Sequence, residues 1–156
     1  MFKRILTALL LAAVLFGFAA CGAKTSKIVI ATDATWPPME MVDESKNIVG
    51  FDIDLMNAAA KAGGFAVEFK NTAWDGIFAG LEGSKYDAVM SSVTITDERK
   101  QTMDFSVPYI NAGQILVVKN EVSGVETLSD LAGKTVAAQI GTTGAFEIDK
   151  YSDVKK

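Results

Sequence analysis

The residues best suited to chemistry lie in the stretch Ser91 to Lys100, directly after the apolar run Ala88–Met90. This stretch combines serine and threonine hydroxyl groups, backbone N–H groups at the end of an expected strand, and the guanidinium of Arg99. A guanidinium offers a planar fork that matches the two oxygens of a carboxylate, while hydroxyl and N–H groups satisfy the remaining lone pairs. The stretch therefore predicts a carboxylate clamp formed by Arg99, Ser92 and Thr94.

A simpler interpretation of the same residues stays open at the level of sequence. Thr96 fits the N-cap position of a helix, and Asp97 and Glu98 would then lie in its first turn. On that interpretation Arg99 only pairs with one of these two acids at a solvated helix end.

Three further groups of residues occupy positions where α/β folds bind ligands, at the ends of strands and the starts of helices. They are Asp33 with Trp36, Trp74 alone, and Gln139 to Thr143. Each has a structural alternative, because an aspartate also caps turns, Trp74 has the spacing of a helix core residue, and short Gly/Thr turns are common. With the clamp, the two aromatic side chains and the lone acid describe an amino-acid pocket. The acid would pair with a distal amine or guanidinium of the ligand, and the aromatic rings would contact its side chain.

The elements that position these residues alternate between strands and helices. Buried or half-buried strands are expected over Lys27–Thr32, Phe65–Lys70 and Tyr86–Met90 from their β-branched and alternating residues. Helical spacing is expected from Gly50 to Lys61 and from Trp74 to Gly83. This strand–helix order predicts an α/β fold with a mostly parallel sheet covered by helices.

Two other segments shape the expected pocket. Pro37 and Pro38 predict a stiff loop over Asp33–Met39 that holds Trp36 in place, and Ile48–Val49 is expected to form a short strand.

Strand–helix order restarts after a polar linker that begins at Asn120. An apolar strand is expected at Gln114–Lys119 before the linker and another at Lys134–Ala138 after it, with short helices at 127–131 and from Ala145. We therefore expect a first lobe over residues 28–119 and the beginning of a second over 120–156. The second is shorter than a normal domain, so the chain is expected to be shorter than the protein this architecture needs.

Composition excludes several classes of function. The sequence has 15 Lys and Arg against 19 Asp and Glu, a net charge of −4, which becomes −6 without residues 1–20 and argues against a nucleic-acid partner. It contains no histidine, which excludes histidine-based general-base catalysis and removes the commonest transition-metal ligand. Nothing in the sequence calls for a metal ion or another cofactor.

The first 20 residues have the pattern of an export signal, with Lys3 and Arg4 followed by a short apolar run that ends in small residues. Cys21, the only cysteine, follows directly and resembles the acylated cysteine of bacterial lipoproteins, although Phe18 stands where leucine is usual. We expect lipidation at Cys21 and a polar tether over 21–27. The alternatives are a cut near Ala20 that leaves a free thiol, and an uncleaved membrane anchor.

Several motifs together resemble the polar amino-acid family of substrate-binding proteins that serve ABC transporters. The matching segments, in the family's order, are Ala31–Asp33, Pro37–Glu40, Gly50–Leu55, Trp74–Gly76, Thr94–Arg99, Asp104–Tyr109 and Gly141–Gly144. The resemblance covers residues 28–150. It implies a periplasmic-binding-protein-like fold of two α/β lobes that close on a ligand, with the first lobe mostly present here and the second only begun.

The resemblance also implies roles for individual residues. Arg99, Ser92 and Thr94 would hold the ligand α-carboxylate, Asp33 would read the polar end of the ligand side chain, and Gln139 would contribute specificity from the second lobe. The full candidate ligand-binding set is Asp33, Trp36, Trp74, Ser91, Ser92, Thr94, Arg99, Gln139, Thr142 and Thr143. The family's acid for the ligand α-ammonium has no counterpart in the chain.

The expected function is capture of a polar L-amino acid outside the cytoplasm by a lipid-anchored protein that delivers it to an ABC permease. Asp33 and the two tryptophans favour a cationic amino acid, and glutamine is the main competitor. Two alternatives are a cyclohexadienyl dehydratase-like enzyme on the same fold and a sensor domain of a receptor.

Overall fold

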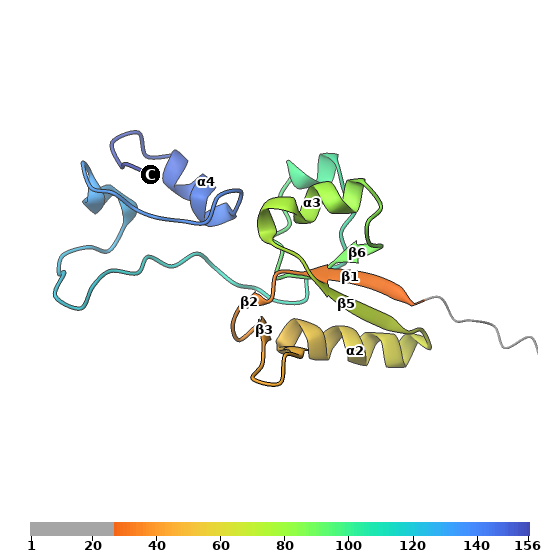
Figure 1. The fold of residues 1–156 in the computed structure, drawn as a ribbon. Helices are drawn as coiled ribbons and strands as arrows, with labels where there is room; N and C mark the ends of the chain where they lie inside the picture. Colours follow the sequence, from red (N-terminus) through yellow and green to blue (C-terminus); the bar gives the residue numbers. More distant parts are fainter. Residues whose placement is uncertain (1–26) are drawn as a thin grey trace, which may run out of the picture.

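The computed structural model describes residues 27–156, and its best-defined layer is a parallel three-stranded sheet. Strand β1 (Ile28–Thr32) lies in the centre, with β5 (Val67–Asn71) on one side and β6 (Ala88–Val89) on the other. Helices α2 (Phe51–Gly63) and α3 (Trp74–Glu82) connect the strands and lie on opposite sides of the sheet (Figure 1). The predicted strand–helix alternation and α/β class are confirmed. The expected export signal and Cys21 lie outside the described residues.

Helix α2 has the ends that its sequence predicts. Asp52 and Asp54 lie in its first turn, where the helix dipole favours negative charge, and Gly64 caps its last turn in the left-handed conformation with φ of 70°. The buried face includes Ile53 and Ala60, at helical spacing.

A small antiparallel sheet contains the predicted strand at Ile48–Val49 and also covers part of the segment where the sequence predicts a loop. Strands β2 (Thr35–Trp36), β3 (Glu40–Val42) and β4 (Ile48–Val49) pair in that order, so the expectation of an irregular loop through Trp36 is wrong. Strands of two or three residues are too short to show an alternation of apolar and polar residues. The proline pair was therefore the stronger signal, and it favours a loop. The sheet is anchored to α2, because the N–H groups of Phe51 and Asp52 donate to the carbonyls of Pro38 and Met39.

The chain after β6 contains little regular structure among the described residues. It forms two short 3₁₀ turns, η1 (Arg99–Gln101) and η2 (Leu128–Leu131), and helix α4 (Thr143–Asp149). The cyan segment in Figure 1 runs as an extended chain from the sheet layer to the part that carries α4.

The strands expected at Gln114–Lys119 and Lys134–Ala138 do not form. An apolar extended segment becomes a strand only when a neighbour satisfies its backbone, and the first segment instead exposes Ile115 (85%) and Val117 (79%). The second makes only one isolated parallel bridge, between Thr135 and Lys155.

The core beside the site packs α3 against the sheet. Ala31, Ile77 and Tyr86 are its buried centre, and the Tyr86 hydroxyl donates to the carbonyl of Ile77. Gly80 lies on the same face of α3, and a Cβ there would overlap the Tyr86 ring and its oxygen. The close approach of this ring to the helix therefore requires glycine at position 80.

We predict that Gly80→Ala lowers the free energy of unfolding by about 1–2 kcal/mol, because overpacking costs about 1–3 kcal/mol and higher helix propensity returns at most about 1 kcal/mol. Gly76→Ala, on the same helix with open space around the new Cβ, is the matched control and should be neutral or stabilising. Urea unfolding followed by circular dichroism measures both. Equal midpoints for the two variants would contradict the tight Gly80–Tyr86 contact.

Candidate functional site

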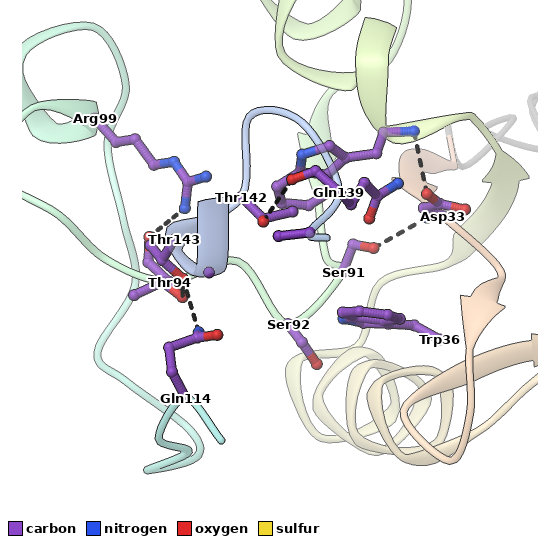
Figure 2. Close-up of a pocket in the computed structure, with 13 residues that line it drawn as sticks. Asp33, Trp36, Ser91, Ser92, Thr94, Arg99, Gln114, Gln139, Thr142 and Thr143 are labelled. Carbon is purple, nitrogen blue, oxygen red and sulfur yellow. Dashed lines mark hydrogen bonds between the residues drawn. The ribbon is translucent and has the colours of Figure 1, made fainter. Parts of the chain in front are cut away.

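One pocket gathers all ten residues that the sequence singles out. It is an open cavity of about 190 Å³ at the carboxyl ends of the parallel strands, where it meets the chain leading into α4. Its lining consists of Asp33, Trp36, Trp74, Ser91, Ser92, Thr94, Arg99, Gln114, Ala138, Gln139, Thr142, Thr143 and Gly144. In Figure 2, Arg99 lies on one side of the pocket, and Asp33 and Trp36 lie on the other.

Arg99 is a buried cation in this pocket. Only 9% of it is exposed, and its guanidinium lies 5.6 Å from the ring centre of Trp74 and 5.1 Å from that of Phe78. Its Nη1 donates to the Thr94 carbonyl at 2.8 Å and its Nη2 to the Gly141 carbonyl at 3.0 Å. These bonds use two of the five N–H donors of the group, which fixes the plane of the fork.

Arg99 does not lie at a solvated helix end, so the simpler interpretation of this stretch is wrong. Lys100, not Arg99, forms the ion pair with Asp97, at 3.0 Å on the surface. The Thr96 hydroxyl accepts from the Arg99 N–H at 3.2 Å, but the element that follows is only the short 3₁₀ helix η1, and its N-cap is Glu98 rather than Thr96. Burial lowers the pKa of the Arg99 guanidinium, which nevertheless stays charged at neutral pH.

Asp33 both lines the pocket and caps α3. One carboxylate oxygen accepts from the Thr35 hydroxyl at 2.8 Å and the other from the Trp74 N–H at 3.1 Å. The N-cap residue of α3, Ala73, has no side chain for this purpose. Asp33 therefore acts as a cap, which was its structural alternative, and these two hydrogen bonds hold its carboxylate in a fixed position at the pocket.

The two tryptophans differ in how they are held. Trp74 packs edge-on to Phe78, with ring centres 5.1 Å apart, and joins the core while also facing the pocket. Trp36 lies on β2 and is 54% exposed, so it is held less firmly than Trp74.

The pocket face nearest α4 is built by threonine hydroxyls. The Thr142 side chain caps α4 by accepting from the Ala145 N–H at 3.3 Å, and it donates to the Gln139 carbonyl at 2.7 Å. The Thr143 hydroxyl lies 3.3 Å from that of Thr94, which joins the two sides of the pocket.

Gln114 is a lining residue that the sequence analysis missed. Its amide donates to the Thr143 hydroxyl at 2.9 Å, as Figure 2 shows. The only sequence signal for Gln114 is that it is a polar residue at the start of an apolar run. Because that run was expected to form a strand, Gln114 was assigned to the strand and not to the pocket.

The pocket serines turn their hydroxyl groups toward buried acids. The Ser91 hydroxyl accepts from the Asp33 N–H at 3.0 Å and donates to Glu40 at 2.7 Å, and Ser92 donates to Asp52 from its N–H at 2.7 Å and its hydroxyl at 3.2 Å. Glu40 and Asp52 were not recognised as part of the site. Acidic side chains are usually exposed, and no sequence pattern indicates that these two are buried.

Two negative findings apply to residues 27–156. They contain no group of His, Cys, Asp and Glu side chains that could hold a metal ion. None of their helices has the length and apolar character needed to cross a membrane.

Comparison with known proteins gives consistent matches. Residues 28–152 match the family model of bacterial extracellular solute-binding proteins, family 3. The chain is 45% identical over 123 residues to a probable histidine-binding protein of Neisseria gonorrhoeae, covering 78% of this chain and 45% of that protein. It is 37% identical to the arginine-binding extracellular protein ArtP of Bacillus subtilis, covering 90% of this chain and 57% of the relative.

A solved structure shares the fold. The arginine-, lysine-, histidine-binding protein ArtJ of Geobacillus stearothermophilus superimposes with a TM-score of 0.77 at 44% identity, over 84% of this chain and 58% of that one. The chain therefore has the α/β fold of periplasmic amino-acid-binding proteins and spans about half the length of the curated relatives it matches.

The double role of Asp33 gives a stability prediction. Asp33→Ala removes the cap of α3 and should lower the free energy of unfolding by about 1–2 kcal/mol, whereas Asp33→Asn keeps one amide oxygen and should cost less. Asp75→Ala changes an exposed first-turn acid of the same helix and serves as the control, with an expected effect of about 0.5 kcal/mol. Urea denaturation decides: an Asp33→Ala midpoint equal to that of Asp75→Ala would rule out the cap.

Proposed function

This chain belongs to family 3 of the bacterial extracellular solute-binding proteins, and we propose that it captures a polar L-amino acid and delivers it to an ABC importer. The observation that carries the proposal is the buried Arg99 fork at one side of a pocket that has the Asp33 carboxylate at the other. An α-amino acid with a basic side chain presents the complementary groups, a carboxylate and a distal cation. The relatives reported above are named as binding proteins, which supports binding without bond chemistry.

In the proposed complex Arg99 receives the ligand α-carboxylate. Its guanidinium is already oriented by two backbone carbonyls and two aromatic rings, so little freedom is lost on binding. Thr94 contributes its hydroxyl, and Ser91 and Ser92 line the pocket floor. Thr142 and Thr143 complete the carboxylate site from the side of α4.

The other side of the pocket sets the choice of amino acid. Asp33 would accept from the distal amine or guanidinium of the ligand, Trp36 and Trp74 would contact its methylene groups or ring, and Gln139 would add a polar contact. This arrangement favours arginine, lysine, histidine or ornithine. The names of the relatives, which refer to arginine, lysine and histidine, support this preference, and glutamine is the competitor because an aspartate also accepts from an amide.

Capture is proposed to occur by closure of two lobes, with residues 28–119 in the first lobe and residues from 120 onward in the second. The liganded closed form would then be the one that the permease recognises. We further propose that residues 1–20 direct export, that Cys21 carries the lipid that holds the protein at the outer side of a membrane, and that 21–27 form the tether. Mass spectrometry of the membrane-extracted protein, with Cys21→Ser as control, would detect the acyl groups.

The clamp is tested by replacing Arg99. We predict that Arg99→Ala weakens binding of every α-amino acid by about 2–5 kcal/mol, because it removes a buried charge-assisted contact. Arg99→Lys should recover only part of this loss, since an ammonium cannot form the same fork. Isothermal titration calorimetry with the twenty amino acids measures both variants. Lys100→Ala, an exposed cation next in sequence, is the control, and normal binding by Arg99→Ala would refute the clamp.

The role of Asp33 is tested by ligand preference. Asp33→Asn should weaken binding of arginine and lysine by about 1.5–3 kcal/mol and leave glutamine binding nearly unchanged, because only the cations lose a charged partner. Asparagine keeps an acceptor oxygen for the α3 cap, which limits effects on folding. Competition calorimetry with arginine and glutamine gives the ratio of affinities. An equal loss for both ligands would show that Asp33 acts only through structure.

A further inference from the structure

Two fully buried acids lie behind the pocket floor with one unsatisfied oxygen each. Glu40 on β3 and Asp52 in the first turn of α2 are both 0% exposed. Within residues 27–156, Glu40 Oε2 and Asp52 Oδ1 have no hydrogen-bond partner. The backbones of the two segments are joined, because the Asp52 N–H donates to the Met39 carbonyl at 3.0 Å.

The remaining oxygen of each acid holds a pocket residue. Glu40 Oε1 accepts from the Ser91 hydroxyl at 2.7 Å. Asp52 Oδ2 accepts from the Ser92 N–H at 2.7 Å, from the Ser92 hydroxyl at 3.2 Å and from the Tyr109 hydroxyl at 2.9 Å. The two serines of the pocket floor are therefore oriented from behind by this pair.

The charges around the pair do not permit both acids to be ionised. The titratable groups that act on Glu40 are Asp52 from α2 and Asp33 from the end of β1, and Tyr109 faces Asp52. All of these are acids, so two buried carboxylates would repel each other without a compensating cation. Asp52 is the better anion, since it accepts three donors and lies at a helix N-terminus.

We propose that Glu40 and Asp52 share one proton, carried by Glu40, and that this neutralised pair positions Ser91 and Ser92 in the ligand pocket. A proton on Glu40 would allow a carboxyl–carboxylate hydrogen bond to Asp52, which would satisfy both of the oxygens that otherwise lack a partner. Glu40 is also the register partner of Trp36 in the β2–β3 pairing, so the same residue holds the strand that carries one aromatic wall.

The acidity of Glu40 supports this assignment. The pKa of Glu40 is raised from 4.5 to about 8, and burial is the main cause. The bond from Ser91 opposes the rise, while the charge of Asp52 and the interaction between the two carboxyl groups contribute to it. The charge of Asp33 also raises it. Burial, together with the charge of Asp52, raises the pKa of Tyr109 as well, so its hydroxyl remains a donor to Asp52 over the same range.

The first test is infrared spectroscopy of the unliganded protein. The wild type should show the C=O stretch of a protonated carboxyl group at pH 7, and the band should disappear as pH rises through about 8. Glu40→Gln should lack the band, while Glu44→Gln, a change of an exposed glutamate between β3 and β4, should keep it. Asp52→Asn should move the disappearance of the band to lower pH, because it removes a charge that adds to the effect of burial on Glu40. Absence of the band from the wild type at pH 7 would overturn the proposal.

The second test follows stability with pH. A raised native pKa means that the stabilisation is complete below pH 4.5 and is lost as pH rises to about 8. The unfolding equilibrium constant of the wild type, divided by that of Glu40→Gln, should thus increase about tenfold per pH unit in this window. A ratio that stays constant with pH would contradict the shared proton. If Glu40→Gln does not fold, Asp52→Asn replaces it, and the ratio should then rise only over the upper part of this pH window, because Glu40 keeps the part of its raised pKa that is due to burial.

The last test concerns the pocket and depends on the proposed function. Arginine affinity should fall as pH rises above about 8 in the wild type and remain steady in Glu40→Gln, since glutamine keeps both bonds without a proton to lose. A fall of equal size in both proteins would refute the positioning role. If no amino acid binds at any pH, the proposed function fails, while the infrared and unfolding measurements still decide whether the proton is shared.

Discussion

The site depends on the parallel pairing of β1 with β5 and β6. Parallel strands end at the same edge of the sheet, so the residues that follow each strand meet although they are far apart in the sequence. The bond from the Asp33 N–H to the Ser91 hydroxyl joins the ends of β1 and β6, and the bond from the Trp74 N–H to the Asp33 carboxylate joins β1 to the helix that follows β5. Without this pairing the pocket would lose its floor and one wall together.

The structural and functional interpretations of the pocket residues are compatible. Asp33 caps α3, Trp74 packs on the core, and Arg99 donates to two carbonyls, yet all three face the cavity. A residue held by such contacts has one orientation before any ligand arrives, which lowers the entropy lost on binding. Asp33 can therefore serve both as the cap of α3 and as a residue of the pocket.

Much of this arrangement follows from the sequence, for identifiable reasons. The β-branched run at Ile28–Thr32 and the glycine-ended helix at Phe51–Gly63 obey local rules, and the strand-end rule then brings the ten candidate residues to one cavity. The expected strand at Gln114–Lys119 fails because strand formation needs a partner, which an apolar pattern does not guarantee. The short strand β3 and the burial of Glu40 depend on tertiary contacts alone, and no periodicity reveals them.

The buried pair completes the electrostatic design of the pocket. Asp33 is negative at one side and Asp52 is the anion behind Ser92, so a further full charge on Glu40 behind Ser91 would add to the negative potential across the floor. That potential would oppose a ligand carboxylate at Arg99 as much as it would attract a cation at Asp33, so a zwitterionic ligand with a basic tail would gain little. Holding a proton on Glu40 removes this conflict at neutral pH. It leaves the positive charge of Arg99 and the negative charge of Asp33 separated across the cavity, as binding of the proposed amino-acid ligand would require.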